Sequence, residues 1–240
     1  MRWHVVESYE EMSRMAAGII AEALERNPRL VLGLATGSTP VGTYRELIKA
    51  FQEGKISFKE AFAVNLDEYV GLAPDHPQSY AYFMEEELFS HVDMPPDHRH
   101  IPRGLAPDLD EECRRYEEVI RNLGGVDLQL LGIGVNGHIG FNEPGTPFDA
   151  RTHVVELTPS TREANARFFE SIDEVPTHAI TMGLGTILEA RHILLLASGP
   201  TKREAIRALR EGEPDPEWPA TCLWLHKNVD VIVDREAYGE

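Results

Sequence analysis

Short apolar runs with the composition of β-strands alternate with longer amphipathic runs along almost the whole chain of 240 residues. Several of these runs are apolar on both faces, which is typical of parallel strands that helices cover on both sides. We therefore expect one α/β domain over residues 1–240, built on a single doubly wound, mostly parallel sheet with helices on both faces. The expected strands lie at 3–6, 30–35, 61–66, 126–134, 153–157, 178–182, 192–197 and 229–233, and the expected helices near 8–26, 40–53, 78–91, 108–123, 159–170 and 201–211.

The charge of the chain limits its partners. Asp and Glu number 40 against 23 Lys and Arg, which gives a formal net charge of −17. This field repels nucleic acid and anionic membranes, but an anionic small molecule can bind where local donors and bases oppose it. The two cysteines form no disulfide framework, and we find neither a signal-peptide core nor a membrane-spanning apolar run. We expect a cytoplasmic protein that binds a small molecule.

Two loops that follow expected strands have the character of anion sites. Ligands of open α/β sheets bind beyond the carboxyl ends of the strands. The loop Thr36-Gly37-Ser38-Thr39 leads into a helix, where free backbone N–H groups and hydroxyls attract an anion. Lys202 lies in the first turn of another expected helix, where a cation opposes the helix dipole unless an anion is close. The alternatives are plain N-capping by Ser38 or Thr39 and a solvated lysine.

Two acids, Asp67 and Glu68, close the apolar strand at 61–66. A carboxylate held near the core at this point has its pKa raised by desolvation and can serve as a general base. The alternative is an acid that caps a helix or forms a turn.

The stretch "LGIGVNGHIGFNEPG" contains G-x-G-x-x-G at 132–137, the dinucleotide-binding fingerprint. That motif requires a helix after its third glycine, but His138, two further glycines and two prolines follow within ten residues, and no helix tolerates this sequence. The fold is therefore expected to be Rossmann-like but not dinucleotide-binding. The loop instead presents Asn136, His138 and Glu143. A Glu that accepts a hydrogen bond from one imidazole nitrogen raises the basicity of the other; a structural histidine is the alternative.

Three further histidines, His91, His98 and His100, lie among acids in "HVDMPPDHRH". Their spacing matches no zinc-binding pattern, and the prolines indicate a surface loop. We expect no metal site there.

Five stretches run in order from residue 34 to residue 191: "LATGSTPVGTY", "NLDEYVGL", "LGIGVNGHIGFNEPG", "TREANARFF" and "MGLGTILEAR". Together they resemble one family, the isomerising glucosamine-6-phosphate deaminases. The related 6-phosphogluconolactonases share the glycine-rich loop but have a different acid motif and no "FNEP". The resemblance implies hydrolytic deamination and aldose–ketose isomerisation of glucosamine 6-phosphate to fructose 6-phosphate and ammonia, with no metal or organic cofactor.

The resemblance also implies roles for individual residues. The general base of the family matches Asp67, which moves a proton between the second and first carbons of the sugar. The ring-opening group matches His138, oriented by Glu143, with Asn136 beside it. A mobile lid is implied around 158–175. The substrate-binding and phosphate-binding positions match Thr36, Gly37, Ser38, Thr39, Glu68, Gly137, Arg167 and Lys202.

Two positions depart from the pattern of many relatives. Asn136 stands where many have Asp, so this position can orient His138 but carries no charge. Several bacterial relatives are hexamers that N-acetylglucosamine 6-phosphate activates through basic side chains after the "NEP" motif. This chain has Arg151 and His153 there, but Val155 where a base is expected. We expect a monomer or small homo-oligomer without that activation.

Two other functions stay open on the residues alone. A hydrolase of a phosphorylated sugar lactone needs a base and a phosphate site but no proton shuttle between adjacent carbons. A non-catalytic sugar-phosphate sensor usually adds a DNA-binding domain and tends to lose the acids that this chain keeps.

Overall fold

The computed structural model describes all residues from Met1 to Glu240. Its main sheet has seven strands, and every pair of neighbours in it is parallel. Their order across the sheet is β1 (Arg2–Val6), β10 (Val229–Asp234), β9 (His192–Ala197), β6 (Leu128–Leu131), β2 (Val31–Leu34), β3 (Phe62–Asn65) and β5 (Arg99–His100). The expected fold class is confirmed.

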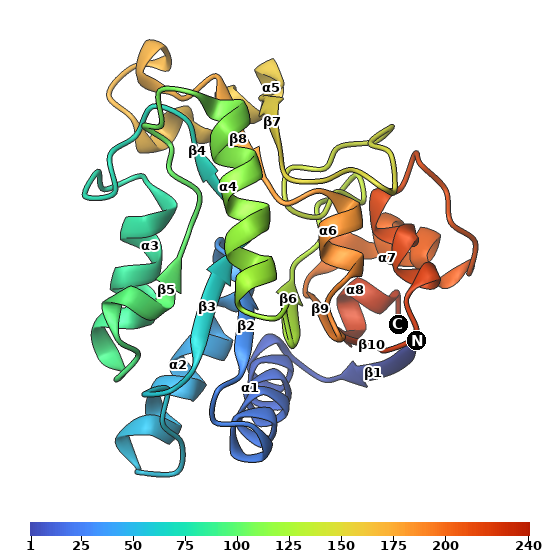
Figure 1. Ribbon diagram of the computed structural model, residues 1–240. Coiled ribbons are helices and arrows are strands. Elements are labelled where there is room, and N and C mark those ends of the chain that lie inside the picture. The colour runs from blue at the N-terminus through green and yellow to red at the C-terminus, as the bar shows by residue number, and fades with distance from the viewer.

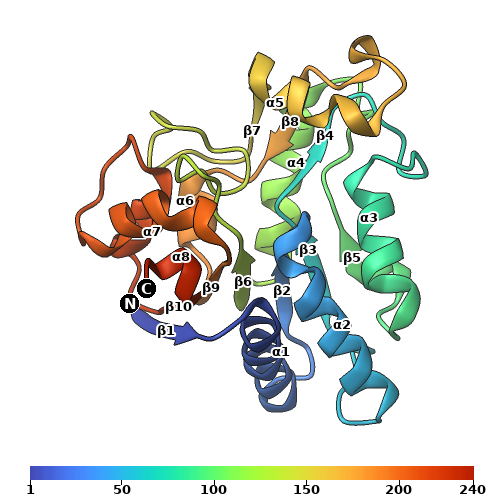
Figure 2. The same ribbon diagram turned by 180° about the vertical axis from the view of Figure 1, so that it is seen from behind.

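Helices cover both faces of this sheet because neighbouring strand residues point to opposite sides. Val31 belongs to a core of 27 buried residues on one face, whereas Leu32 belongs to a core of 23 on the other. Figure 1 views the molecule from the side of the first core and Figure 2 from the side of the second. The first core packs on α4 (Leu109–Asn122), α6 (Leu184–Leu188), α7 (Arg203–Arg210) and α8 (Arg235–Tyr238), and the second on α1 (Tyr9–Arg26), α2 (Ser38–Gln52) and α3 (Tyr80–Glu87).

A second, smaller sheet lies above the carboxyl edge of the main one (Figure 1). It is antiparallel and has the order β4 (Asp67–Tyr69), β8 (His178–Thr181) and β7 (His153–Glu156). The expectation that the strands at 153–157 and 178–182 belong to one single sheet is therefore corrected. Strand composition predicts an extended conformation but does not say which strand is the neighbour.

Several elements were not expected from the sequence, and all of them are short. They include β4, β5, α6 and α8.

No helix is both long enough and apolar enough to cross a membrane. The remaining helices are α5 (Pro159–Asn165) and the 3₁₀ turns Phe89–His91, Pro96–His98, Ala166–Phe168, Ile172–Glu174, Pro200–Lys202 and Pro219–Leu225.

The strand order reverses direction between β2 and β6. From β2 the chain builds outward through β3 to β5, and from β6 it builds the other way through β9 to β10. The carboxyl ends of β2 and β6 therefore flank a topological switch point, where open α/β sheets bind ligands.

Candidate active site

A cavity of about 410 Å³ opens at this switch point. It brings together segments that follow β2, β3, β6 and β9, together with the start of α3. Seven of the residues proposed from the sequence line it: Thr36, Gly37, Ser38, Thr39, Asp67, His138 and Lys202. The other five, which do not line it, are Glu68, Asn136, Gly137, Glu143 and Arg167.

Two helix starts near the cavity have no side chain that caps them; the first lines the cavity, and the second contributes Lys202 to the lining. Gly37 is the N-cap of α2 with φ of 93°, a left-handed conformation that favours glycine, and no side chain caps the helix. Gly199 plays the same part before the 3₁₀ turn that leads into α7, with φ of 91°. The alternative that Ser38 or Thr39 caps the helix is therefore not what the structure shows. The uncapped N–H groups of α2 make an anion cradle.

Lys202 adds the positive charge of the cradle. Its ammonium group donates to the backbone carbonyl of Ile133 at 2.6 Å. Burial lowers the pKa of Lys202. The side chain thus joins the helix start after β9 to the loop after β6, and it faces the same cavity as Ser38 and Thr39.

Asp67 is the buried acid of the cavity. Asp67 is only 7% exposed. No hydrogen-bond donor of the chain bonds to its carboxylate, in contrast to that of Glu68. Burial, with a smaller contribution from the charge of Glu68, raises the pKa of Asp67 to about 8. A carboxylate with so high a pKa is a stronger base than an ordinary one, which suits the removal of a proton from carbon.

Glu68, which was expected to bind substrate, does not line the cavity. Its carboxylate accepts backbone hydrogen bonds from Tyr69, Tyr80 and Ala81 at 2.8, 2.9 and 3.0 Å. Tyr80 and Ala81 form the first turn of α3, where a negative charge is favoured. Glu68 therefore holds the helix that carries Tyr80 into the cavity.

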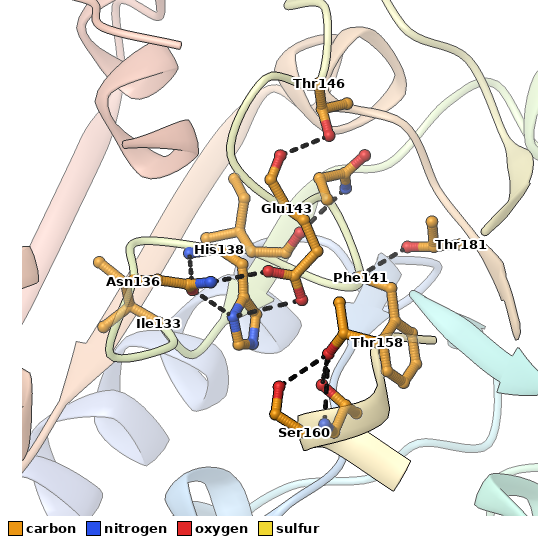
Figure 3. A network of polar contacts seen from close by, with 12 residues as sticks. Ile133, Asn136, His138, Phe141, Glu143, Thr146, Thr158, Ser160 and Thr181 are labelled. Carbon is orange, nitrogen blue, oxygen red and sulfur yellow. Dashed lines mark hydrogen bonds and ion pairs between the residues drawn. The ribbon is translucent and has the colours of Figure 1, made fainter. Parts of the chain in front are cut away.

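His138 is held by the side-chain amide of Asn136, which contacts both the imidazole and Glu143 (Figure 3). Asn136 Nδ2 donates to Glu143 Oε2 at 2.7 Å, and Asn136 Oδ1 lies 2.7 Å from His138 Nδ1. Glu143 Oε1 is 3.8 Å from that nitrogen, which is within ion-pair distance but too long for a hydrogen bond, so the hydrogen-bonded link between the two side chains passes through Asn136.

The direction of this amide determines the protonation of the imidazole. The carboxylate of Glu143 can only accept, so the nitrogen of the amide faces it and the amide oxygen faces His138. Nδ1 of His138 therefore carries the proton and Nε2 keeps its lone pair. Burial, and to a lesser degree Lys202, lowers the pKa of His138, while Glu143 opposes this change. A neutral imidazole with a free Nε2 is a proton acceptor.

A glycine gives the imidazole its place. A Cβ atom on Gly134 would lie 2.0 Å from Cε1 of His138, so only glycine leaves room for the ring. Gly134 also donates to the carbonyl of His138 at 2.8 Å, and Gly137 donates to the carbonyl of Gly134 at 2.9 Å. The glycines that resembled a nucleotide fingerprint thus form a turn that seats a histidine.

Arg167 lies in a neighbouring cavity of about 470 Å³ rather than in the first one. Its guanidinium group stacks on Phe168, 4.6 Å from the ring centroid. The two cavities share Gly37, Ser38 and Tyr80.

Sequence reasoning missed Tyr80 and Phe141, which line the cavity. Their rings stack with centroids 6.2 Å apart, and the ring of Tyr80 also packs against that of Tyr69, with centroids 4.7 Å apart. Phe141 lies inside the motif that singled out His138, but Tyr80 comes from a separate helix that no motif marks.

The three histidines of the 91–100 loop do not converge. His91 contacts the carbonyl of Glu86 and His98 that of Ala61, while His100 lines a separate small cavity. No group of three or more His, Cys, Asp or Glu side chains is arranged to hold a metal ion.

The fold and the cavity together define an α/β protein that presents an anion cradle beside a buried carboxyl group and a neutral imidazole. The model of the family described as glucosamine-6-phosphate isomerases/6-phosphogluconolactonase matches residues 6–233. The chain belongs to this family.

Relatives within the family are similar over nearly their full length. The glucosamine-6-phosphate deaminase of Bacillus pumilus is 55% identical over 231 residues, which cover 96% of each chain. That of Geobacillus sp. is 56% identical over 230 residues, covering 96% of this chain and 92% of the relative. A solved structure of a monomeric glucosamine-6-phosphate deaminase superposes with a TM-score of 0.96 at 53% identity, covering 100% of this chain and 99% of that one.

A more distant solved structure shares the fold alone. The 6-phosphogluconolactonase from Trypanosoma cruzi has a TM-score of 0.77 at 22% identity, and the match covers 100% of this chain and 96% of that one.

Proposed function

We propose that this chain converts glucosamine 6-phosphate and water into fructose 6-phosphate and ammonia. Relatives at 53–56% identity carry the name of this activity. One observation carries the proposal: an anion cradle, a buried carboxyl group with a raised pKa and an imidazole with a free nitrogen line the same cavity of about 410 Å³. The reaction needs one group to hold the phosphate, one base for carbon and one proton carrier for the ring oxygen.

The phosphate of the substrate binds at the start of α2. The free N–H groups of this helix start and the hydroxyls of Thr36, Ser38 and Thr39 donate to its oxygens, and Lys202 supplies a positive charge. This anchoring places the sugar carbons between Asp67 and His138.

His138 opens the pyranose ring. Its Nε2 accepts the proton of the anomeric hydroxyl, and the resulting imidazolium returns a proton to the ring oxygen as the bond to the first carbon breaks. Asn136 and Glu143 stabilise the transient positive charge, Asn136 through its carbonyl oxygen at 2.7 Å from Nδ1 and Glu143 through its carboxylate at 3.8 Å.

Asp67 performs the isomerisation. Its carboxylate removes the proton from the second carbon of the open-chain aldose, an enolamine forms, and Asp67 returns the proton to the first carbon. Water then adds to the resulting imine at the second carbon, and ammonia leaves to give the ketone. The carbonyl and amine of the substrate delocalise the developing charge, so these steps require neither a metal nor an organic cofactor.

The ammonium group of the substrate sets the charge of Asp67. A nearby positive charge favours the ionised form of a carboxyl group. Binding of the substrate therefore lowers the pKa of Asp67 from its value of about 8, so that the carboxyl group ionises and can act as a base.

Residues 158–175 act as a lid in this proposal. Arg167 already faces a cavity that shares Ser38 with the phosphate cradle. Asn165 donates to the hydroxyl of Tyr69 at 3.0 Å, which connects the segment to β4. A small movement of the segment brings Arg167 to the phosphate.

The enzyme works as a monomer or small homo-oligomer without activation by N-acetylglucosamine 6-phosphate. The similar structure described as monomeric supports the first part. For the second, the guanidinium group of Arg151 is engaged by Glu117 at 2.7 Å and by Glu189 at 2.7 Å, and position 155 is valine. Two buried, free cysteines support a cytoplasmic location.

The test is the release of ammonia from glucosamine 6-phosphate by the purified protein, coupled to the appearance of fructose 6-phosphate. Hydrolysis of 6-phosphogluconolactone is measured in parallel. Lactone hydrolysis without ammonia identifies a lactonase, and binding of both sugars without turnover identifies a sensor; either result rejects the proposal.

A further inference from the structure

A segment outside the cavity holds the loop that carries His138. Figures 1 and 2 both show the orange-red chain between α7 and β10 beside the yellow-green loop that follows β6. Residues 215–221 of this chain, which we call the 215–221 turn, contribute nothing to the lining of the cavity. Any effect of this turn on the reaction therefore passes through the loop.

The turn is joined to the loop at two separate places. Ala220 donates to the carbonyl of Gly137 at 2.8 Å, and Gly145 donates to the carbonyl of Pro216 at 2.8 Å. Gly137 and Gly145 lie on either side of the segment that contains His138 and Glu143. Both ends of the segment are thus fixed to the same short piece of chain.

Trp218 lies in the turn between Pro216 and Ala220, the two residues that bond to the loop, and it packs on the loop itself. A Cβ atom on Gly137 would lie 2.9 Å from Cε3 of Trp218 and 3.2 Å from its Cα, so the indole packs directly against the glycine. Gly137 has φ of 83°, a conformation that glycine adopts at little cost. Asn136 and His138 are the chain neighbours of this glycine, so the indole supports the point from which both side chains project.

The 215–221 turn is itself well anchored. The buried hydroxyl of Thr221 donates to the carbonyl of Trp218 at 2.7 Å and accepts from the backbone of Asp215 at 2.7 Å. Ala220, Cys222 and Leu223 belong to the larger core. A support that is tied to the core transmits rigidity to whatever rests on it.

We propose that Trp218 is a positioning residue for the reaction: it packs on Gly137 and so fixes the orientation of Asn136 and His138. This inference rests on the proposed function for its kinetic consequence. It assigns to Trp218 a role in the ring-opening step and none in binding the phosphate, because the cradle is built on α2 and on the start of α7.

The test compares Trp218→Ala with Trp224→Ala. Both tryptophans are partly buried and pack against the same core, but the indole N–H of Trp224 donates to the carbonyl of Leu209 in α7, away from the two hydrogen bonds that join the turn to the loop. We expect Trp218→Ala to lower kcat by roughly 10–100-fold, as small misplacements of catalytic groups do, with KM and inhibition by inorganic phosphate unchanged. Trp224→Ala should keep the kcat of the parent, and Trp218→Phe should recover most of it.

Equal kcat values for the two alanine variants overturn the inference, as does a loss that appears in KM and phosphate inhibition instead of kcat. If Trp218→Ala does not fold, Trp218→Leu is measured in the same way. An unmodified enzyme without ammonia release defeats the proposed function but not this inference. NMR titration of His138 then decides: its lowered pKa should move toward that of free imidazole in the Trp218 variant and not in the Trp224 variant.

Discussion

Lys202 donates a hydrogen bond from its ammonium group to the backbone carbonyl of Ile133 at a distance of 2.6 Å. The donor belongs to the phosphate cradle and the acceptor begins the loop that leads to His138. The side chain of Lys202 therefore connects the phosphate cradle with the loop that carries His138. Binding of a phosphate gives the ammonium group a second, charged partner without requiring it to leave the first.

Lys202→Met should weaken binding of glucosamine 6-phosphate about 10–100-fold, because a hydrogen bond to a charged group contributes roughly 1.5–3 kcal/mol. Inhibition by inorganic phosphate should weaken in parallel. Lys202→Arg serves as the control for charge. Unchanged KM and phosphate inhibition in the methionine variant would remove Lys202 from the cradle.

Asp67→Asn should abolish turnover while leaving substrate binding nearly intact, since the phosphate is held elsewhere. Glucosamine 6-phosphate binding is measured by calorimetry and turnover by ammonia release. Retained turnover would mean that another group is the base on carbon.

The same substitution makes a separate prediction about stability. The pKa of Asp67 is about 8 in the folded chain against an ordinary 3.8, so the folded state holds a proton that the unfolded state has lost. The stability contributed by this proton is present at low pH and is lost as the pH rises toward about 8. Asp67→Asn should therefore unfold at a higher temperature than the parent protein, by a margin that grows between pH 4 and pH 8. Melting curves across this range check it, and a constant margin contradicts it.

Asn136→Asp should move the acid limb of kcat/KM to higher pH. A carboxylate at 2.7 Å from Nδ1 stabilises the imidazolium and raises the lowered pKa of His138. Asn136→Ala removes the acceptor without adding charge, so it should reduce kcat and leave the acid limb in place or lower. A profile that does not differ between the two variants contradicts the bridging role of the amide.

Asp230 should matter for stability and not for turnover. It accepts from Arg2, His4 and His192 at 2.8, 2.8 and 2.6 Å, at the end of the sheet opposite the cavity. These hydrogen bonds outweigh burial and hold its pKa well below the ordinary 3.8, so its stabilisation is present above that pH and is lost as the pH falls. Asp230→Asn should lower the free energy of unfolding at pH 7 by about 2 kcal/mol, measured by urea denaturation, with kcat unaltered.

The velocity curve for glucosamine 6-phosphate should be hyperbolic and should not respond to N-acetylglucosamine 6-phosphate, because Arg151 is already occupied by two carboxylates. Initial rates with and without this effector check the expectation. A sigmoidal curve that the effector makes hyperbolic would refute it.

The sequence predicts the main sheet well because its strands are buried on both faces and leave an unmistakable apolar pattern. All eight expected strands are present, including those at β2 and β9. What it misses depends on neighbours in space. β4 has only three residues, and β8 pairs with β4 on one side and with β7 on the other rather than with the main sheet.

The site shows the same division. The acid at the end of a strand and the histidine in the glycine-rich loop were predicted as proton acceptors from the sequence, and both Asp67 and His138 line the cavity. Nothing in "NLDEY" says that Glu68 turns away to hold α3, and nothing in the glycine-rich motif says that Asn136 lies between His138 and Glu143. Such directions are decided by elements packed from elsewhere in the chain.

Both thiols of the molecule are shielded. Cys113 and Cys222 are buried and free, and burial raises the pKa of the first to about 11 and of the second to about 12. Thiolate is the reactive form of cysteine, so alkylating reagents should hardly modify these two residues in the native protein. A cysteine introduced at the exposed Glu163 would be labelled alone, and a fluorophore there would report directly whether the segment above the cavity moves when phosphate arrives.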